Sequence, residues 1–218
     1  MKPQNMTSKI KYGFLLVIFT ALHSLNASSS AVSYPFATFV MDAYSGQELH
    51  SQNANKKLHP ASLTKMMTLY LVFNEVENGD LDLDQKIPIS RNAVREPPSK
   101  FGYKVGQKVS VRYLIRAAAI RSANDAATAL GEAVSGTEAA FGEYMTRTAE
   151  AMGMLQTSFR NANGLTASGH LSSAKDMAIL SRRLLFDFPN YFHLFGRSSV
   201  IALERKLYNT NRKFLASY

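Results

Sequence analysis

The segment Pro60–Phe73 constrains this chain most, because it is largely apolar and contains a single charged residue, Lys65. Side chains three residues apart share one face of a helix, so we expect the Lys65 amine to reach the Ser62 hydroxyl. A helix that is apolar on all sides is normally buried, and burial lowers the pKa of a lysine. A serine beside a partly neutral amine is an activated nucleophile. With Ser62 in the first helical turn, where backbone N–H groups are free for an oxyanion, the segment favours acyl transfer.

The spacing Ser-x-x-Lys is weak on its own, because it also occurs at Ser8/Lys11 and Ser172/Lys175. Ser8 lies in a basic leader, whereas Ser173 and Asp176 predict a capping box that leaves Lys175 in an exposed first turn. The alternative for Ser62 is a helix N-cap, with Lys65 extending to the surface. Of the three pairs, only Ser62 and Lys65 lie on an apolar helix, and this context favours them as the nucleophile and its base.

A second polar cluster, Ser122-Ala123-Asn124-Asp125, separates two helical patterns at 112–121 and 125–135. Ser122 and Asn124 therefore fall in a tight helix–helix connection, where side chains can point into a cleft. The alternative is helix capping, which Ser, Asn and Asp all favour. Ser-x-Asn also recurs at residues 24, 51 and 90, so it identifies nothing alone.

Together these segments closely resemble the serine D-alanyl-D-alanine carboxypeptidases, the low-molecular-mass penicillin-binding proteins. Residues 60–68 resemble the nucleophile motif of that family and residues 122–127 its second motif. The resemblance covers roughly residues 35–218 in the order of the family, including segments 39–46, 53–55, 104–107, 163–165 and 172–178.

The resemblance implies an α+β fold in which a helical region packs on a five-stranded antiparallel sheet, with the site between them. Most of that sheet is missing from this sequence. Residue patterns predict strands at 37–42 and 48–51, joined by a turn at 44–46, and an extended pair near 86–89 and 108–111. They predict helices from Ser62 and at 112–121, 125–135, 138–152 and 174–187, with a late strand at 199–203.

The resemblance also implies a reaction on peptidoglycan stem peptides, with β-lactam antibiotics as inhibitors and no cofactor or metal. Ser62 would attack the carbonyl of the penultimate D-Ala, and Lys65 would accept the hydroxyl proton. Ser122 would relay a proton to the leaving D-Ala, while Asn124 orients Lys65 and the substrate. The Ser62 backbone N–H would be one oxyanion donor. No residue of this chain is predicted to bind the substrate carboxylate.

The third motif of the family, Lys-Thr-Gly or a close variant, does not occur in the sequence. We therefore expect residues 32–218 to form a C-terminally incomplete catalytic domain. Losing one oxyanion donor costs roughly 10²–10³ in rate, so such a piece should be a poor enzyme. Without the sheet we also expect apolar residues of the Ser62 helix to be exposed and the chain to fold poorly, specifically through Met66, Leu69, Tyr70 and Phe73.

The first 31 residues predict a secretory signal peptide. Three lysines precede the apolar run 12–22, and small residues follow, with cleavage expected after Ala31 or, less well matched, after Ala27. Removal of these lysines lowers the formal charge from +9 to +6. Export to the periplasmic or cell-envelope side of the bacterial inner membrane follows. The absence of cysteine excludes thiol catalysis.

The dispersed lysines and arginines, with no recognisable motif, argue against nucleic acid as a partner and favour a solvated basic surface. Contact with a membrane surface or the cell wall is the alternative. The lone histidines His59, His170 and His193 are expected to be ordinary surface or core residues. Two other functions stay open. One is a catalytically dead remnant of the family. The other is a serine β-lactamase, which the absence of a Glu-x-x-Leu-Asn segment disfavours.

Overall fold

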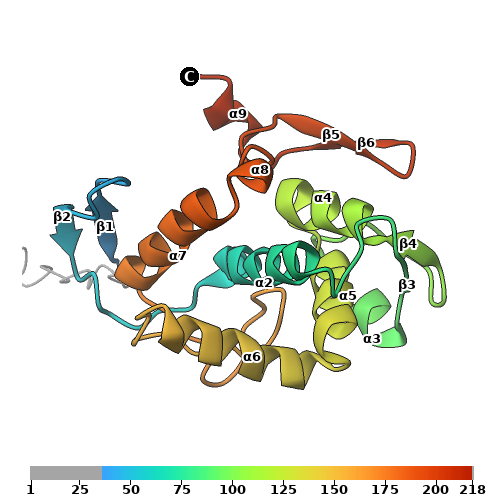
Figure 1. The fold of residues 1–218 in the computed structure, drawn as a ribbon, viewed down its shortest axis with the longest axis horizontal. Coiled ribbons are helices and arrows are strands. Elements are labelled where there is room, and N and C mark those ends of the chain that lie inside the picture. Colours follow the sequence, from blue (N-terminus) through green and yellow to red (C-terminus); the bar gives the residue numbers. More distant parts are fainter. Residues whose placement is uncertain (1–35, 218) are drawn as a thin grey trace, which may run out of the picture. The chain divides into compact units, whose positions relative to one another are not determined.

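Helix α2 (Thr64–Asn78) runs through the middle of the structure, and four other helices pack around it (Figure 1). The computed structural model describes residues 36–217. The first ten residues of α2 are buried except Met66, which is half-buried. The surrounding helices are α4 (Val111–Arg121), α5 (Asn124–Ser135), α6 (Glu138–Ala151) and α7 (Ala174–Asp187). The predicted burial of the segment from Thr64 to Phe73 is therefore confirmed.

The helices α4 to α7 confirm the predicted ranges to within one residue at each end. The starts of α6 and α7 follow from capping side chains: Thr137 accepts from the backbone N–H of Ala140, and Ser173 accepts from that of Asp176. Only half of the predicted capping box forms, because the Asp176 carboxylate accepts from Gln156 N and the Thr157 hydroxyl instead. For the same reason α7 lies against the 156–157 segment.

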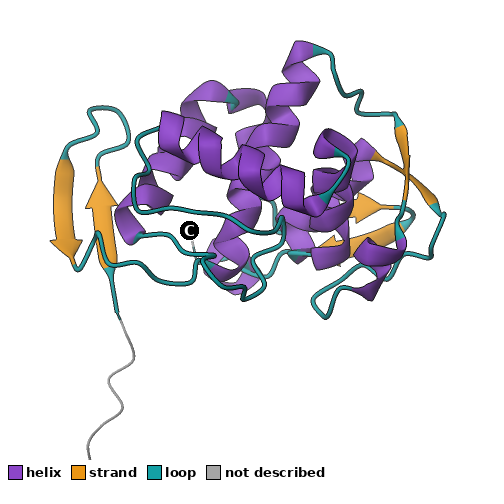
Figure 2. Cartoon of the chain, turned by 90° about the horizontal axis from the view of Figure 1, so that it is seen from below, coloured by secondary structure: helices purple, strands orange, loops and turns teal. Residues whose placement is uncertain are grey.

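The strands form three separate two-stranded antiparallel sheets. β1 (Thr38–Met41) pairs with β2 (Glu48–Gln52), β3 (Lys86–Pro88) with β4 (Lys108–Ser110), and β5 (Ser199–Ala202) with β6 (Arg205–Tyr208). Figure 2 shows β1 and β2 at one end of the helical region, with other strands at the opposite end. The predicted strands are thus confirmed, and β6 is an addition.

Several short elements escaped the sequence analysis: a 3₁₀ turn η1 (Ala61–Leu63), β6, α3 (Arg91–Arg95), α8 (Pro189–Phe192) and α9 (Arg212–Leu215). A helix of three to five residues makes too few turns to show a hydrophobic period. One difference concerns the site directly. Ser62 lies in η1, immediately before α2, rather than in the first turn of the α-helix as predicted.

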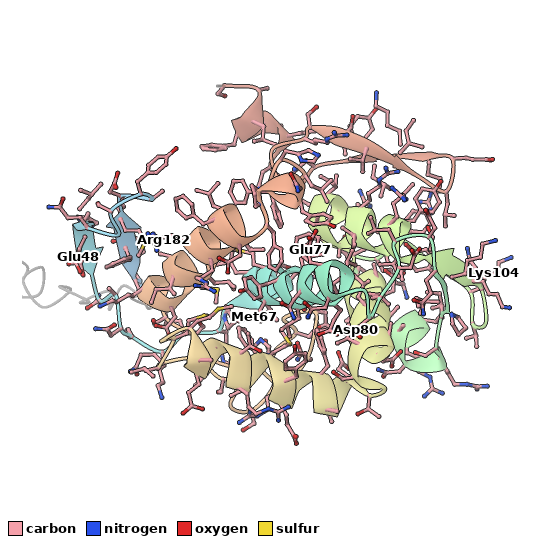
Figure 3. The ribbon with its side chains drawn as sticks, viewed as in Figure 1. Glu48, Met67, Glu77, Asp80, Lys104 and Arg182 are labelled. Carbon is pink, nitrogen blue, oxygen red and sulfur yellow. The ribbon has the colours of Figure 1, made fainter. Side chains whose placement is uncertain are left out.

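The expectation that α2 exposes apolar residues is wrong for the described part of the chain. Leu69, Tyr70 and Phe73 are all less than a tenth exposed. The reason lies in the unpredicted segment around α8: Tyr191 stacks on Phe73 at 4.5 Å between ring centroids, and Phe188 packs edge-on against Tyr70 at 4.9 Å. Figure 3 shows Met67 of α2 in the middle of the described unit, whereas Glu48 and Lys104 lie at its edges.

The predicted signal peptide lies outside the described residues. Among residues 36–217, none of the helices combines the length and apolar character that crossing a bilayer requires.

Candidate active site

The Lys65 amine is the centre of the candidate site. Its nitrogen lies 3.4 Å from Ser62 Oγ, 2.8 Å from Asn124 Oδ1 and 2.6 Å from the carbonyl oxygen of Asn163. Lys65 is only 3 % exposed, whereas the neighbouring Ser62 is open to solvent. The structure therefore brings the predicted pair together, with a buried amine beside an accessible hydroxyl. The alternative of a lysine extending to the surface is wrong.

Burial changes the acid–base behaviour of this amine. Desolvation lowers the pKa of Lys65 to about 8, while the carboxylate of Glu96 acts in the opposite direction. A substantial fraction of Lys65 is consequently neutral in mildly alkaline solution. A neutral amine within reach of a serine hydroxyl can accept its proton, which is the requirement for a general base.

The turn that carries Ser62 is held by a close backbone contact. Ala61 has a positive φ of 48°, a conformation that costs an alanine roughly 1 kcal/mol or more. Its carbonyl oxygen lies against the α-carbon of Gly164, where any Cβ would collide with it. Only glycine fits at position 164, so the 161–165 loop and the turn before α2 are locked together.

The second motif also lies in a strained connection. Ser122 ends α4 with a φ of 57°, and α5 begins two residues later with Ala123 as its N-cap. Ser122 is therefore the C-cap of α4, whereas neither Ser122 nor Asn124 is the N-cap of α5. Asn124 instead donates through Nδ2 to the carbonyl of Pro97 at 2.9 Å, which orients its Oδ1 toward Lys65.

A buried carboxylate next to Asn124 supports this connection. Asp125 is fully buried and accepts from the backbone N–H groups of Phe101 at 2.9 Å and Gly102 at 2.8 Å. The loop that precedes β4 is thus tied to the first turn of α5. The sequence marks Asp125 only as part of a motif, because its partners are backbone groups that have no sequence signature.

His170 fixes the start of α2 from the opposite side. It is buried, its Nδ1 accepts from Arg160 N at 3.0 Å, and its Nε2 lies 2.8 Å from Thr64 Oγ1. Since Nδ1 is an acceptor, Nε2 carries the proton and donates to Thr64. Desolvation lowers the pKa of His170 to about 4. The expectation of a core histidine is confirmed, but its position beside the site was not foreseen.

The other described Ser-x-x-Lys pair has a different environment. Ser172 is buried, and its hydroxyl lies 2.8 Å from that of Thr157. Lys175 is half-buried rather than exposed, with its ammonium 6.0 Å from the ring centre of Phe39. Among residues 36–217, only Ser62 and Lys65 therefore combine this spacing with a direct contact.

A cleft of about 370 Å³ opens next to the three predicted residues Ser62, Lys65 and Ser122. Its other walls come from α2, α4 and the C-terminal segment, namely Met66, Leu69, Ala118, Ala119, Phe195, Thr210 and Asn211. Within the described residues, no group of three or more His, Asp or Glu side chains is arranged to hold a metal ion. A nucleophile and a base beside a largely apolar cleft suit covalent catalysis on a small acyl group.

The fold and the arrangement of Ser62, Lys65 and Asn124 agree with a match between this sequence and one protein family. Residues 27–218 match the model of the D-alanyl-D-alanine carboxypeptidases, Peptidase S11. The chain belongs to this family of serine-type carboxypeptidases, which confirms the resemblance, and its neighbours confirm the penicillin-binding protein fold.

Individual relatives agree with this assignment. D-alanyl-D-alanine carboxypeptidase DacF of Bacillus subtilis is 32% identical over 186 residues, which cover 84% of this chain and 48% of DacF. The crystal structure of the carboxypeptidase DacD from Francisella tularensis is 38% identical with a TM-score of 0.74, covering 82% of this chain and 44% of that one. Penicillin-binding protein D2 from Listeria monocytogenes, solved in an ampicillin-bound form, is 33% identical with a TM-score of 0.75, covering 84% and 74%. The chain spans about half the length of the curated relatives it matches.

Proposed function

We propose that this protein is a serine-type D-Ala-D-Ala carboxypeptidase that removes the terminal D-Ala from peptidoglycan stem peptides. The observation that carries the proposal is the buried Lys65 amine, held between Ser62 Oγ and Asn124 Oδ1. Membership of the family supports the reaction class, and the ampicillin-bound form of a relative supports β-lactams as inhibitors.

In the proposed reaction Ser62 Oγ attacks the carbonyl carbon of the penultimate D-Ala, and its proton passes to Lys65. A bond forms between Oγ and the acyl carbon, while the peptide bond to the terminal D-Ala breaks. Ser122 relays this proton from Lys65 to the departing amine and so regains its own, and Asn124 keeps Lys65 and the substrate amide in place. Water then hydrolyses the acyl-enzyme and releases the shortened peptide. The Ser62 backbone N–H is proposed as one oxyanion donor.

The proposed place of action is the periplasmic or cell-envelope side of the inner membrane. The predicted signal peptide in residues 1–31 supports export, and the stem peptides of the cell wall are the corresponding substrate. Residues 32–218 are proposed as the catalytic domain of the exported protein.

The direct test is covalent labelling by a penicillin, because a β-lactam stops the reaction at the acyl-enzyme. The intact, family-length protein is purified and incubated with fluorescent penicillin, and the labelled peptide is located by mass spectrometry. We expect the adduct on Ser62 and its loss in Ser62→Ala. Ser172→Ala alters the serine of the other Ser-x-x-Lys pair and is the control, which should keep the adduct. An adduct on Ser122 or Ser172 would show that the nucleophile is assigned wrongly.

The fate of the label distinguishes the alternatives. A stable adduct together with D-Ala release from a D-Ala-D-Ala peptide identifies a carboxypeptidase. Rapid hydrolysis of penicillin identifies a β-lactamase. A folded protein that takes up no label is a non-catalytic member of the family, and our proposal would then be wrong.

A further inference from the structure

Asn163, whose carbonyl oxygen contacts Lys65, is also linked through Thr128 to two glutamates, Glu96 and Glu138. Asn163 is buried, and its side-chain nitrogen donates to the hydroxyl of Thr128 at 3.0 Å. That hydroxyl oxygen lies 3.0 Å from Glu96 Oε1 and 3.2 Å from Glu138 Oε1. Thr128 is fully buried, so no bulk water separates these groups at the hydroxyl.

The hydrogen atoms available at this point can be counted. A threonine hydroxyl carries one hydrogen and two lone pairs, and one lone pair here accepts from Asn163. The hydroxyl hydrogen can reach only one of the two carboxyl oxygens. The second carboxyl oxygen then faces the remaining lone pair, which is favourable only if this carboxyl is protonated and donates. The geometry therefore favours one proton on the glutamate pair.

The surroundings indicate which carboxyl carries this proton. Glu138 Oε1 accepts from Ala162 N and from Asn163 Nδ2, each at 3.4 Å, and Asn92 donates to its Oε2 at 3.3 Å. Three N–H groups therefore face the Glu138 carboxyl, which makes Glu138 the better placed acceptor of the pair. Desolvation by burial raises the pKa of Glu96, and the charges of Glu138 and Glu132 act in the same direction, while the hydrogen bonds from Thr128 and Asn163 act against them.

We propose that Glu96 and Glu138 hold one shared proton, carried on Glu96 and bonded through Thr128, and that neutral Glu96 leaves Lys65 without a charged partner. Glu96 and Glu138 are thereby positioning residues for the base in the carboxypeptidase reaction, and this role rests on the proposed function. The shared proton itself does not depend on that function.

The sign of the effect follows from the charges. An ionised Glu96 favours the ammonium form and so raises the pKa of Lys65, whereas a neutral Glu96 does not. The negative charge of Glu138 keeps Glu96 protonated. The titratable groups acting on Glu96 are Glu138 of α6, Glu132 of α5 and Lys65 of α2, and Glu96 itself caps the end of α3. Removing the charge of Glu138 should therefore ionise Glu96 and make Lys65 more basic.

Infrared spectroscopy of the resting protein tests the shared proton. At pH 7 we expect the carbonyl-stretch band of a protonated carboxylic acid, and we expect it to disappear in both Glu96→Gln and Glu138→Gln. In Glu96→Gln the protonated carboxyl itself is removed, and in Glu138→Gln the remaining Glu96 has lost its negatively charged neighbour and ionises. A wild-type spectrum whose acid band is absent, or is unchanged by both substitutions, would overturn the proposal.

The effect on Lys65 is measured by ¹³C NMR titration of its Cε, assigned by comparison with Lys65→Arg. In Glu138→Gln the titration midpoint should rise by roughly one pH unit, a tenfold change in the fraction neutral. The double variant Glu96→Gln/Glu138→Gln should bring the midpoint back to the wild-type value or below it. An unshifted midpoint in Glu138→Gln, or no return in the double variant, would contradict the coupling.

Two further variants complete the test. Glu143→Gln, on the exposed side of α6 beside Arg147, should change neither readout. If Glu138→Gln does not fold, Glu132→Gln should shift the Lys65 midpoint in the same direction by a smaller amount, and no shift there would contradict the proposal.

The pH profile of penicillin acylation should follow the Lys65 midpoint. A protein that takes up no penicillin refutes the proposed function, while the infrared and NMR results still decide the shared proton.

Discussion

Lys65 is the one charged residue of the apolar segment from Thr64 to Phe73, and burial of this part of α2 also buries the Lys65 amine. Burial in turn lowers the pKa of the amine. Its three partners come from different parts of the chain: Ser62 precedes it by three residues, whereas Asn124 and Asn163 follow far downstream. The spacing alone could predict only the first contact. Burial at 3 % exposure decides that the amine loses its proton near pH 8 rather than near its ordinary value.

If Lys65 is the base, acylation should increase as the pH rises through about 8, because only the neutral amine accepts the Ser62 proton. Lys65→Arg keeps the positive charge but has a pKa above 12, so it stays protonated. We expect the rate of penicillin acylation, measured from a time course of labelling, to fall more than tenfold in Lys65→Arg. The melting temperature of this variant should stay at the wild-type value. Lys175→Arg is the matched control. Acylation of Lys65→Arg within tenfold of wild type would mean that Lys65 only positions the substrate.

A second prediction about a single residue concerns Gly164. Gly164→Ala would place a methyl group against the Ala61 carbonyl, in addition to the strain of a φ of 89°. Gly153→Ala is a close control, since Gly153 has a φ of 83° and open space around it. We expect Gly153→Ala to lose only the conformational cost of about 1 kcal/mol, whereas Gly164→Ala loses more stability and also penicillin acylation. Thermal melting and labelling of both variants provide the comparison; equal effects would show that the contact with Ala61 is unimportant.

Among the elements, the start of α2 depends on a loop that is distant in sequence. His170 donates to Thr64 and accepts from Arg160, so it ties the 158–172 segment to the first residue of α2. This arrangement requires a neutral imidazole. A protonated Nδ1 would face the N–H of Arg160 and lose its hydrogen bond.

The pH dependence of stability follows from this histidine. The pKa of His170 is about 4 in the fold and 6.5 as its ordinary value, so the unfolded chain binds the proton more readily. The contribution of His170 is fully present above pH 6.5 and is lost as the pH falls from there to about 4, by up to about 3 kcal/mol. Denaturant unfolding between pH 7 and 4 measures it. In His170→Gln, which has no titrating group, this part of the slope should vanish; an unchanged slope would assign it to other groups.

The predictability of the helices depended on their length. Helices α4 to α7 have 11 to 14 residues and clear end signals, and they were predicted to within one residue. The 3₁₀ turn η1 and α8 have three and four residues, and both were missed. These short pieces matter, because η1 holds Ser62 and α8 covers Phe73. Local pattern therefore located the long elements but not the turns that complete the site and the core.

The packing of the whole described unit runs through α2, and Phe73 illustrates how. Its ring is fully buried, stacks on Tyr191 and packs at 5.7 Å against Phe188. The helix at the centre is thereby joined to a segment more than a hundred residues away. Because this contact spans the unit, its loss should affect the entire transition and not one local region.

We expect Phe73→Ala to destabilise residues 36–217 by about 3–5 kcal/mol, the usual cost of removing a buried phenylalanine ring. Thermal melting followed by both near- and far-ultraviolet circular dichroism should show one shifted transition. Phe186→Ala is the control, because Phe186 is 43% exposed and contacts Tyr44 at the surface; it should cost less than about 1 kcal/mol. Separate transitions for the two probes would show that α2 and the C-terminal segment unfold independently.

The sequence by itself determined the family, the long helices and the contact between Ser62 and Lys65, because these depend on motifs and on spacings within one element. It also determined that the Lys65 pKa would be low, since an apolar helix has to be buried. Only the tertiary structure decided which groups surround that amine. The Asn163 carbonyl, the Pro97 carbonyl that holds Asn124, and the glutamates around Thr128 come together through packing. Backbone carbonyls have no residue signature, and the proximity of two like charges depends on how α3, α5 and α6 meet, which no local pattern records.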